Sequence, residues 1–228
     1  MAKPKIALFQ NHPECSRQCY DGMDHALSPH YDVIRFGTHN NIKDVLSDAA
    51  CVAFPGGIGD SDSYYKFFKR RHGNAVADFV ASGGKYLGIC MGQYWAGSNY
   101  FDILEGCDIE QYIKRPNTNV KRSYGTVTEV QLAKPGQISP IWYDGECPGN
   151  AHMFFYDGGA VVGNGPYDVH AWYTNGDPMA IIQKNVGIVG CHPESEKSWY
   201  DMYPYITNQW HNGEHHAWLL EFVDKLIQ

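Results

Sequence analysis

Short strand-like runs alternate with amphipathic segments along the first ninety residues. Runs that suit buried parallel strands occur at four places: Lys5–Phe9, Tyr31–Phe36, Cys51–Phe54 and Lys85–Ile89. Between them, apolar residues recur at helical spacing in three segments: Ser16–Leu27, Asn41–Ala49 and Tyr64–Ala81. Strands that alternate with helices predict an α/β fold, with a mostly parallel sheet covered by helices on both faces.

The pattern changes between Asp108 and Ile182, where Gly, Pro, Asn and Asp separate short β-type runs. These runs are Thr126–Leu132, Ala160–Val162, His170–Tyr173 and Ala180–Gln183. We expect a strand-rich excursion, partly antiparallel, in this second half. A further strand, Gly187–Cys191, precedes an aromatic segment, Trp199–Trp210, and an amphipathic helix from His215 to Ile227.

Length and charge bound the possibilities further. The chain has 228 residues and is 43% hydrophobic, and neither repeats nor a long linker divide it. We therefore expect a single domain over residues 1–228. A net charge of −7 argues against nucleic acid as a partner, because phosphate binding needs clustered Lys and Arg. The one basic cluster, Lys66–Arg71, is predicted to be the solvated face of a helix whose two Phe point inward.

Cysteine usage and the N-terminal sequence indicate the compartment. Seven cysteines are spread along the chain without a C-x-x-C pair, which favours a reducing environment. Cys15 and Cys19 alone are too few for a metal site, and we expect no metal or cofactor. The start, MAKPKIALF, lacks the apolar region of a signal peptide, and no later stretch approaches a membrane span. The sequence thus predicts a cytoplasmic protein without a membrane partner.

The segment Gly88-Ile89-Cys90-Met91-Gly92 has the spacing of a nucleophile elbow, in which a strand turns sharply into a helix. The glycines at −2 and +2 suit backbones that approach too closely for side chains. Such a corner exposes the Cys90 sulfur above a helix N-terminus, which favours a thiolate and can hold an oxyanion through backbone N–H groups. The alternative is a buried structural cysteine between packing glycines.

A thiol nucleophile needs a base, and the base needs an orienting group. His192-Pro193-Glu194 follows the strand Gly187–Cys191. If that strand lies parallel to Lys85–Ile89, His192 and Cys90 meet at the carboxyl edge of the sheet, where α/β sheets place ligands. A second tripeptide of the same sequence, His12-Pro13-Glu14, also follows a strand and remains a competitor.

Together these motifs resemble the class I (triad-type) glutamine amidotransferases. The resemblance rests on the elbow KYLGICMG, the turn Pro55-Gly56-Gly57 and the late GCHPE. It is closest to the amidotransferase-like domain at the N-terminus of biotin–protein ligases. There the elbow also runs into an aromatic residue, as in Gln93-Tyr94-Trp95, and a Tyr-Asn-Gly-Gly-like segment follows, as in Phe155–Gly159.

The resemblance implies a flavodoxin-like fold and a role for each matching residue. Cys90 would attack a carboxamide, glutamine above all, His192 would move the proton and Glu194 would hold His192. The N–H groups of Gly57 or Ile58 and of Met91 would form the oxyanion hole. The substrate-binding set that goes with them is completed by Gly56, Gln93 and Tyr94.

The sequence departs from the family at one telling position. Typical members carry Gln four residues after the nucleophile, whereas this chain has Tyr94 there and Gln93 one residue early. One residue turns a helical side chain by about 100°, so the glutamine pocket is altered. In the loop Ile58–Ser63, Asp60 or Asp62 could bind a substrate ammonium or cap a helix.

Three functions stay open. The first is a glutamine amidotransferase that supplies ammonia to a synthetase or acceptor protein in trans, because the chain has no P-loop. The second is a stand-alone hydrolase of γ-glutamyl amides. The third is a non-catalytic binding or regulatory module. A redox-sensing cysteine on the same elbow is a weaker fourth option. Trp199–Trp210 could be a lid, a partner surface or a cover for the sheet edge.

Overall fold

The computed structural model describes residues 2–11, 13–134 and 150–228. The strands in chain order are β1 (Lys5–Phe9), β2 (Asp32–Phe36), β3 (Cys51–Phe54), β4 (Lys85–Ile89), β5 (Cys107–Gln111), β6 (Thr126–Leu132), β7 (Asn150–Phe155), β8 (Gly159–Gly163), β9 (Asp168–Tyr173), β10 (Pro178–Gln183) and β11 (Val186–Val189). The helices are α1 (Arg17–Leu27), α2 (Ile42–Ser47), α3 (Ser61–His72), α4 (Ala75–Ala81), α5 (Met91–Trp95), α6 (Lys197–Asp201) and α7 (Glu214–Ile227). Within these ranges no helix is long and apolar enough to cross a membrane.

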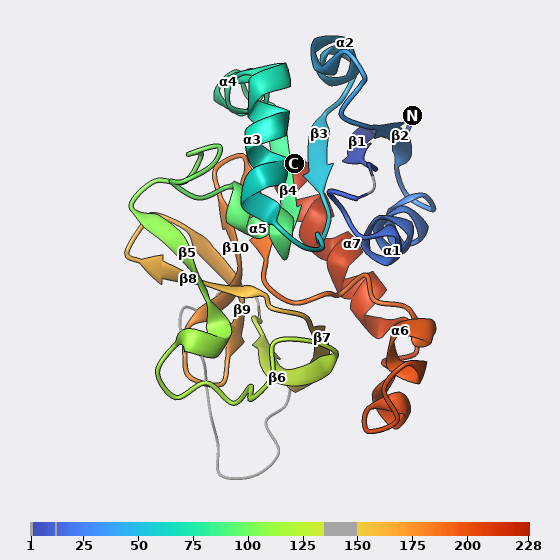
Figure 1. The fold of residues 1–228 in the computed structure, drawn as a ribbon, viewed down its shortest axis with the longest axis vertical. Helices are drawn as coiled ribbons and strands as arrows, with labels where there is room; N and C mark the ends of the chain where they lie inside the picture. Colours follow the sequence, from blue (N-terminus) through green and yellow to red (C-terminus); the bar gives the residue numbers. More distant parts are fainter. Residues whose placement is uncertain (1, 12, 135–149) are drawn as a thin grey trace.

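One sheet organises the molecule, with the strand order β2-β1-β3-β4-β11-β10-β9-β6-β7. The first five strands in this order run parallel, and the last four continue the sheet in antiparallel fashion. Figure 1 shows β6, β7 and β9 in the lower half of the view, away from β1 and β2 at its upper right. The predicted α/β sheet with a partly antiparallel excursion is therefore confirmed.

Helices cover both faces of the parallel half. On one face α1 and α7 pack Met23, Leu27 and Phe222 against strand residues such as Ile6 and Leu8. On the other face α2, α3, α4 and α5 bury an aromatic cluster that includes Phe9, Phe54, Phe68, Tyr86 and Trp95. Successive side chains of a strand point to opposite faces of the sheet, so alternate residues of one strand enter different cores.

The strand register places three loops at one edge of the sheet. β11 lies beside β4 with Val189 opposite Ile89, and β3 lies on the other side of β4. The residues that follow β3, β4 and β11 therefore leave the sheet side by side at its carboxyl edge. These residues belong to the three motifs that the sequence singles out.

Several local predictions need correction. The single helix expected over Tyr64–Ala81 is two helices, because Gly73 adopts a φ of 60° that ends α3. Within the basic cluster Phe68 is buried, but Phe67 is exposed on the outer face, where the Arg70 guanidinium covers it. β5, β7 and α6 were not predicted from the sequence, and β11 begins and ends earlier than the predicted strand Gly187–Cys191.

Candidate active site

Cys90 occupies the corner between β4 and α5. Its φ is 52° and its ψ is −103°, a conformation that non-glycine residues rarely adopt and that costs about 1–3 kcal/mol. The corner is held by a hydrogen bond from the Cys90 N–H to Val189 O at 2.9 Å and by one from Tyr94 N–H to Cys90 O at 3.2 Å. Such strain, kept by the surrounding structure, is typical of a functional position.

The two flanking glycines are required by close backbone contacts. A Cβ on Gly88 would lie 2.3 Å from Gly92 O, and a Cβ on Gly92 would lie 2.1 Å from Phe54 O. Neither distance is compatible with a side chain, because the opposing atoms belong to the backbone. This geometry agrees with the expectation that the backbones around Cys90 approach too closely for side chains at positions 88 and 92.

His192 and Glu194 form a buried hydrogen-bonded pair. His192 Nδ1 lies 2.8 Å from Glu194 Oε1, and both side chains are almost completely buried. The pair is placed by an N–H···O bond of 2.9 Å from His192 to Phe154 O, which ties it to β7. On the opposite side Gly22 of α1 leaves room for Glu194, since a Cβ there would lie 2.5 Å from Glu194 O. Glu194 therefore fixes the ring with Nε2 facing away from it.

The surroundings of His192 raise the pKa of its imidazole. Burial alone lowers its pKa, but the negative charge of Glu194 and, when ionised, of the neighbouring thiols Cys90 and Cys19 outweighs burial and raises the pKa of His192 well above its usual value. Its Nε2 has no hydrogen-bond partner among the described residues. The ring can therefore accept a proton and hold it at Nε2.

The Cys90 thiol donates to another acceptor in this structure. Its Sγ lies 3.3 Å from the carbonyl oxygen of Tyr156, in the turn between β7 and β8. Tyr156 is 43% exposed. An incoming carbonyl group at this corner would have to replace that contact, after which the thiol proton could pass to His192.

The expected oxyanion-hole residues line the same corner. A Cβ on Gly57 would lie 2.2 Å from Met91 Sδ, so the loop after β3 touches the elbow. The N–H groups of Gly57 and Met91 have no hydrogen-bond acceptor within the part of the chain that the structure describes. Gly56 lies beneath the imidazole, since a Cβ there would be 2.7 Å from His192 Cε1 and 2.7 Å from Cys19 Sγ. Ile58 is 40% exposed at the mouth of the site.

Gln93 and Tyr94 hold the neighbouring turn instead of facing open space. Gln93 is fully buried, and its Oε1 accepts from the Gly159 N–H at 3.1 Å. The Tyr94 hydroxyl donates to Asp157 O at 3.0 Å. Both contacts support the turn that presents the Tyr156 carbonyl to Cys90. Their placement as substrate-binding residues stays a prediction, and their present contacts are structural.

Cys19 of α1 is a site residue that the sequence analysis did not place. Cys19 Sγ, a His192 ring nitrogen and a Glu194 carboxylate oxygen all lie within 4.8 Å of one another. Burial raises the pKa of the Cys19 thiol, although His192 lowers it in part. Cys, His and Glu are the ligand types that zinc prefers, so these three residues could hold a thiophilic cation. Helical spacing alone carries no signal for this contact.

The structure gives no support to a substrate role for Asp60, and it describes only part of the tripeptide His12-Pro13-Glu14. Asp60 caps α3, with its carboxylate accepting from Ser63 N–H at 3.1 Å, and Asp62 accepts from the Tyr100 hydroxyl. The capping alternative for this loop is therefore the correct one for Asp60. His12 lies outside the described residues, and Glu14 bonds to Asn11 at 2.6 Å and to Thr38 at 3.3 Å.

The site opens into a pocket with a volume of about 200 Å³. Its lining residues come from the start of α1, the loop after β3, the end of β7 and the turn after it, the loop after β11 and the α6 region: Ser16, Gln18, Cys19, Gly57, Ile58, Phe154, Tyr156, His192, Trp199, Met202 and Tyr203. The Trp199 ring lies 5.5 Å from the His192 ring, so the aromatic segment packs against the predicted base as a cover.

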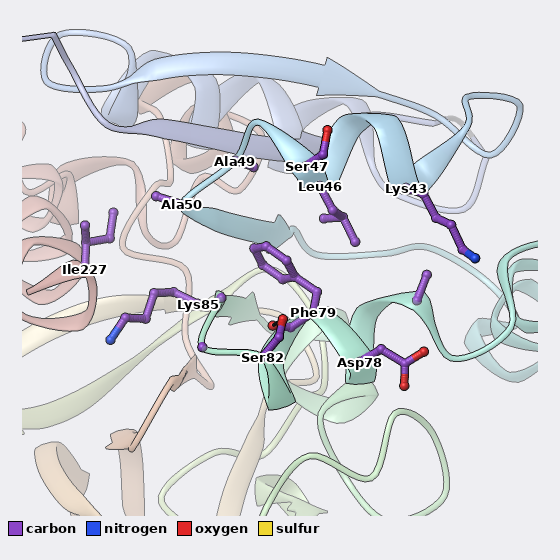
Figure 2. Close-up of a pocket in the computed structure, with 13 residues that line it drawn as sticks. Lys43, Leu46, Ser47, Ala49, Ala50, Asp78, Phe79, Ser82, Lys85 and Ile227 are labelled. Atoms are coloured by element: carbon purple, nitrogen blue, oxygen red, sulfur yellow. Dashed lines mark hydrogen bonds between the residues drawn. The ribbon is translucent and has the colours of Figure 1, made fainter.

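A larger hollow of about 780 Å³ lies at the opposite edge of the sheet. Figure 2 shows its lining between α2, α4 and the start of β4, with Lys43, Asp78, Phe79 and Lys85 around it. It contains neither Cys nor His and lies at the amino ends of β3 and β4. We therefore assign the chemistry to the smaller pocket, which is lined by His192, Cys19 and Gly57.

Comparison with known proteins supports the fold. Residues 10–109 match the family described as biotin-protein ligase, N terminal. A glutamine amidotransferase from Thermotoga maritima aligns over 100% of both chains, with a TM-score of 0.66 and 10% identity. The chain has the class I glutamine amidotransferase-like fold.

Further structures share this fold at similar distance. PurLQS from Thermotoga maritima aligns over 97% of this chain and 99% of its own, with a TM-score of 0.55 and 14% identity. A glutamine amido transferase from Methylobacillus flagellatus aligns over 91% of this chain and 77% of its own, with a TM-score of 0.51 and 11% identity. The search of curated proteins returns no significant match. At these identities the likeness establishes the amidotransferase-like fold alone.

Proposed function

We propose that this amidotransferase-like protein cleaves carboxamides through a thioester on Cys90. The observation that carries the proposal is the buried His192–Glu194 pair, joined at 2.8 Å, whose free Nε2 belongs to the same sheet edge as the strained Cys90 corner. Cys90 as nucleophile, His192 as base and Glu194 as orienting carboxylate would form the general triad arrangement.

The reaction would proceed in two balanced steps. Cys90 Sγ bonds to the amide carbon while its proton passes to His192, and the oxygen gains negative charge that the N–H groups of Gly57 and Met91 stabilise. The C–N bond then breaks as His192 gives the proton to the leaving nitrogen, which departs as ammonia or an amine. Water, deprotonated by His192, attacks the thioester, and the acid and the free thiol of Cys90 result.

The fate of the nitrogen distinguishes two versions of this activity. In an amidotransferase, ammonia from glutamine or a related amide would pass to a synthetase or acceptor protein in trans. In a stand-alone hydrolase, it would be released to solvent. Amide cleavage that accelerates only with a partner supports the first version, and turnover by the chain alone supports the second.

A non-catalytic binding module is the second candidate. It is favoured by one observation: the Cys90 thiol bonds to the Tyr156 carbonyl at 3.3 Å, and Gln93 and Tyr94 are both engaged by the same turn. In that case the fold would present its pocket to a ligand without turnover. Substitution of Cys90 by Ser would then leave the biological activity unchanged.

The decisive experiment measures the reactivity of Cys90 with iodoacetamide, which needs no shaped pocket. We expect rapid single labelling that is absent in Cys90→Ala and about 10²-fold slower in His192→Ala, since a positioned base contributes about 10²–10⁴. Cys15→Ala is a matched control, because Cys15 is buried and burial raises its pKa to about 12; it should label like wild type. Equal rates for wild type and His192→Ala would refute the catalytic pair. His12→Ala tests the competing tripeptide in the same assay.

A further inference from the structure

Apart from His192, whose pKa is raised, no residue that lines the pocket is an acid, a lysine or an arginine. Phe154, Trp199 and Tyr203 contribute aromatic rings, and Ile58 and Met202 contribute aliphatic surface. The remaining side chains of the lining carry thiol, hydroxyl, amide or imidazole groups. A substrate group that enters this pocket must leave water for an apolar surface, which disfavours a charged group.

Exposed apolar side chains gather around the mouth of the same pocket. Among the described residues, the large hydrophobic side chains that are more than a third exposed are Ile58, Phe67, Tyr124, Tyr156, Met202 and Tyr205. Ile58, Tyr156 and Met202 line the pocket itself. The Tyr124 ring lies 6.5 Å from that of Tyr156, and the Tyr205 ring 5.8 Å from that of Tyr203. Only Phe67 lies elsewhere, and a contiguous exposed apolar patch marks a binding surface.

Charged residues next to the pocket are engaged by other groups. Asp157 accepts from Gln111 Nε2 at 3.0 Å, and Asp201 pairs with Lys197 at 2.6 Å. Arg122 stacks on the outer Tyr205 ring, 4.7 Å from its centroid. Arg17 begins α1 between the lining residues Ser16 and Gln18 and is therefore a cation close to the rim of the pocket.

The pocket volume sets the size of the group. About 200 Å³ is somewhat larger than the cavity of about 150 Å³ that admits benzene. We infer that the natural substrate is an amide whose acyl part carries an uncharged apolar or aromatic group of about this size, bound between Ile58, Trp199 and Met202. Free glutamine, with its ammonium and carboxylate, is the wrong class of substrate. This inference rests on the proposed function and specifies it.

Two matched diazoketones test the inference. Both react with the thiol by forming a C–S bond at the diazo carbon, which takes up the thiol proton and loses N₂. One carries the glutamine skeleton with its α-ammonium and α-carboxylate; the other has the same chain length and ends in a phenyl ring. Intact-protein mass gives the labelling rate of Cys90, with Cys90→Ala as blank. We expect the phenyl reagent to label at least about 10-fold faster, the factor that one or two apolar contacts supply.

Variants locate the binding group. Met202 is 50% exposed, so Met202→Glu should leave the fold intact and slow the phenyl reagent about 10-fold more than it slows iodoacetamide. Phe67→Glu is the matched control, because Phe67 is an exposed apolar residue on α3 outside the pocket; it should change neither rate. Ile58→Glu repeats the test on the opposite side of the pocket.

Other results would overturn the inference. Equal rates would show that the pocket does not select an apolar acyl group, and a faster glutamine reagent that Arg17→Ala slows would show that the site binds a zwitterion. No labelling by either diazoketone, with iodoacetamide labelling that still depends on His192, would show that this pocket does not receive the acyl group. All of these outcomes leave the proposed function standing. Iodoacetamide labelling that is independent of His192 would remove the proposed function itself.

Discussion

Gly56→Ala should disable the site by displacing the base. The new methyl would lie 2.7 Å from both His192 Cε1 and Cys19 Sγ, whereas carbon atoms pack at about 3.5 Å. The imidazole would thus have to retreat by about 0.8 Å. A misplacement of about 1 Å can cost about 100-fold in rate, so we expect Cys90 labelling or amide turnover to fall by about that factor. Overpacking should also lower the free energy of unfolding by about 1–3 kcal/mol.

The assay pairs this variant with Cys19→Ala and with the double variant. Cys19→Ala alone removes the sulfur without adding a methyl, so its rate should stay near that of wild type. In the double variant the space left by the sulfur lets the residue 56 backbone shift, and part of the lost rate should return, a non-additivity that a double-mutant cycle measures. Circular dichroism and urea unfolding check that each variant is folded. A folded Gly56→Ala protein with a rate within about threefold of wild type would refute the placement of His192 as base.

Three further predictions concern the same site. Glu194→Gln should reduce turnover by about 10²–10⁴-fold. Because the folded pKa of His192 is raised, the contribution of the His192–Glu194 pair to stability is complete below the unfolded pKa of about 6.5 and is lost as pH rises through the folded pKa. Urea unfolding of the variant should therefore lose this pH dependence of stability. Zn²⁺ should inhibit the labelling of Cys90, EDTA should reverse the inhibition, and Cys19→Ser should relieve it. Equal inhibition of wild type and variant would exclude a zinc site that includes Cys19. Gln93→Leu should lower the free energy of unfolding by about 1–3 kcal/mol, because the Gly159 N–H loses its acceptor; an unchanged urea midpoint would contradict that role.

The parallel half of the fold could be predicted because its signals are local. β4 has the bounds expected from its apolar run, Lys85–Ile89, and the glycines around Cys90 encode the corner that follows. The His192-Pro193-Glu194 motif at the end of a neighbouring strand was enough to predict that His192 and Cys90 share one edge. Short apolar runs bounded by glycine carry this information within a few residues.

The remaining features depend on contacts between distant segments. β5 has the sequence CDIEQ, which lacks an apolar run and becomes a strand through pairing with β8. The contact between Cys90 and Tyr156 spans 66 residues, and Cys19 reaches the site from a helix near the start of the chain. The break at Gly73 was visible as a glycine, but the helical period on both sides of it concealed the boundary. No periodicity of one segment specifies such long-range pairs.

The central position of β11 has a consequence for the order in which the protein matures. β11 lies between β4 and β10, although about a hundred residues of chain separate it from β4. During synthesis, the elbow with Cys90 leaves the ribosome long before His192 exists. Because domains form as their segments emerge, the thiol would remain without a base until the last strand inserts into the middle of the sheet. A nascent or truncated chain would thus carry a sulfur that is chemically idle, and full reactivity would appear only with the finished sheet.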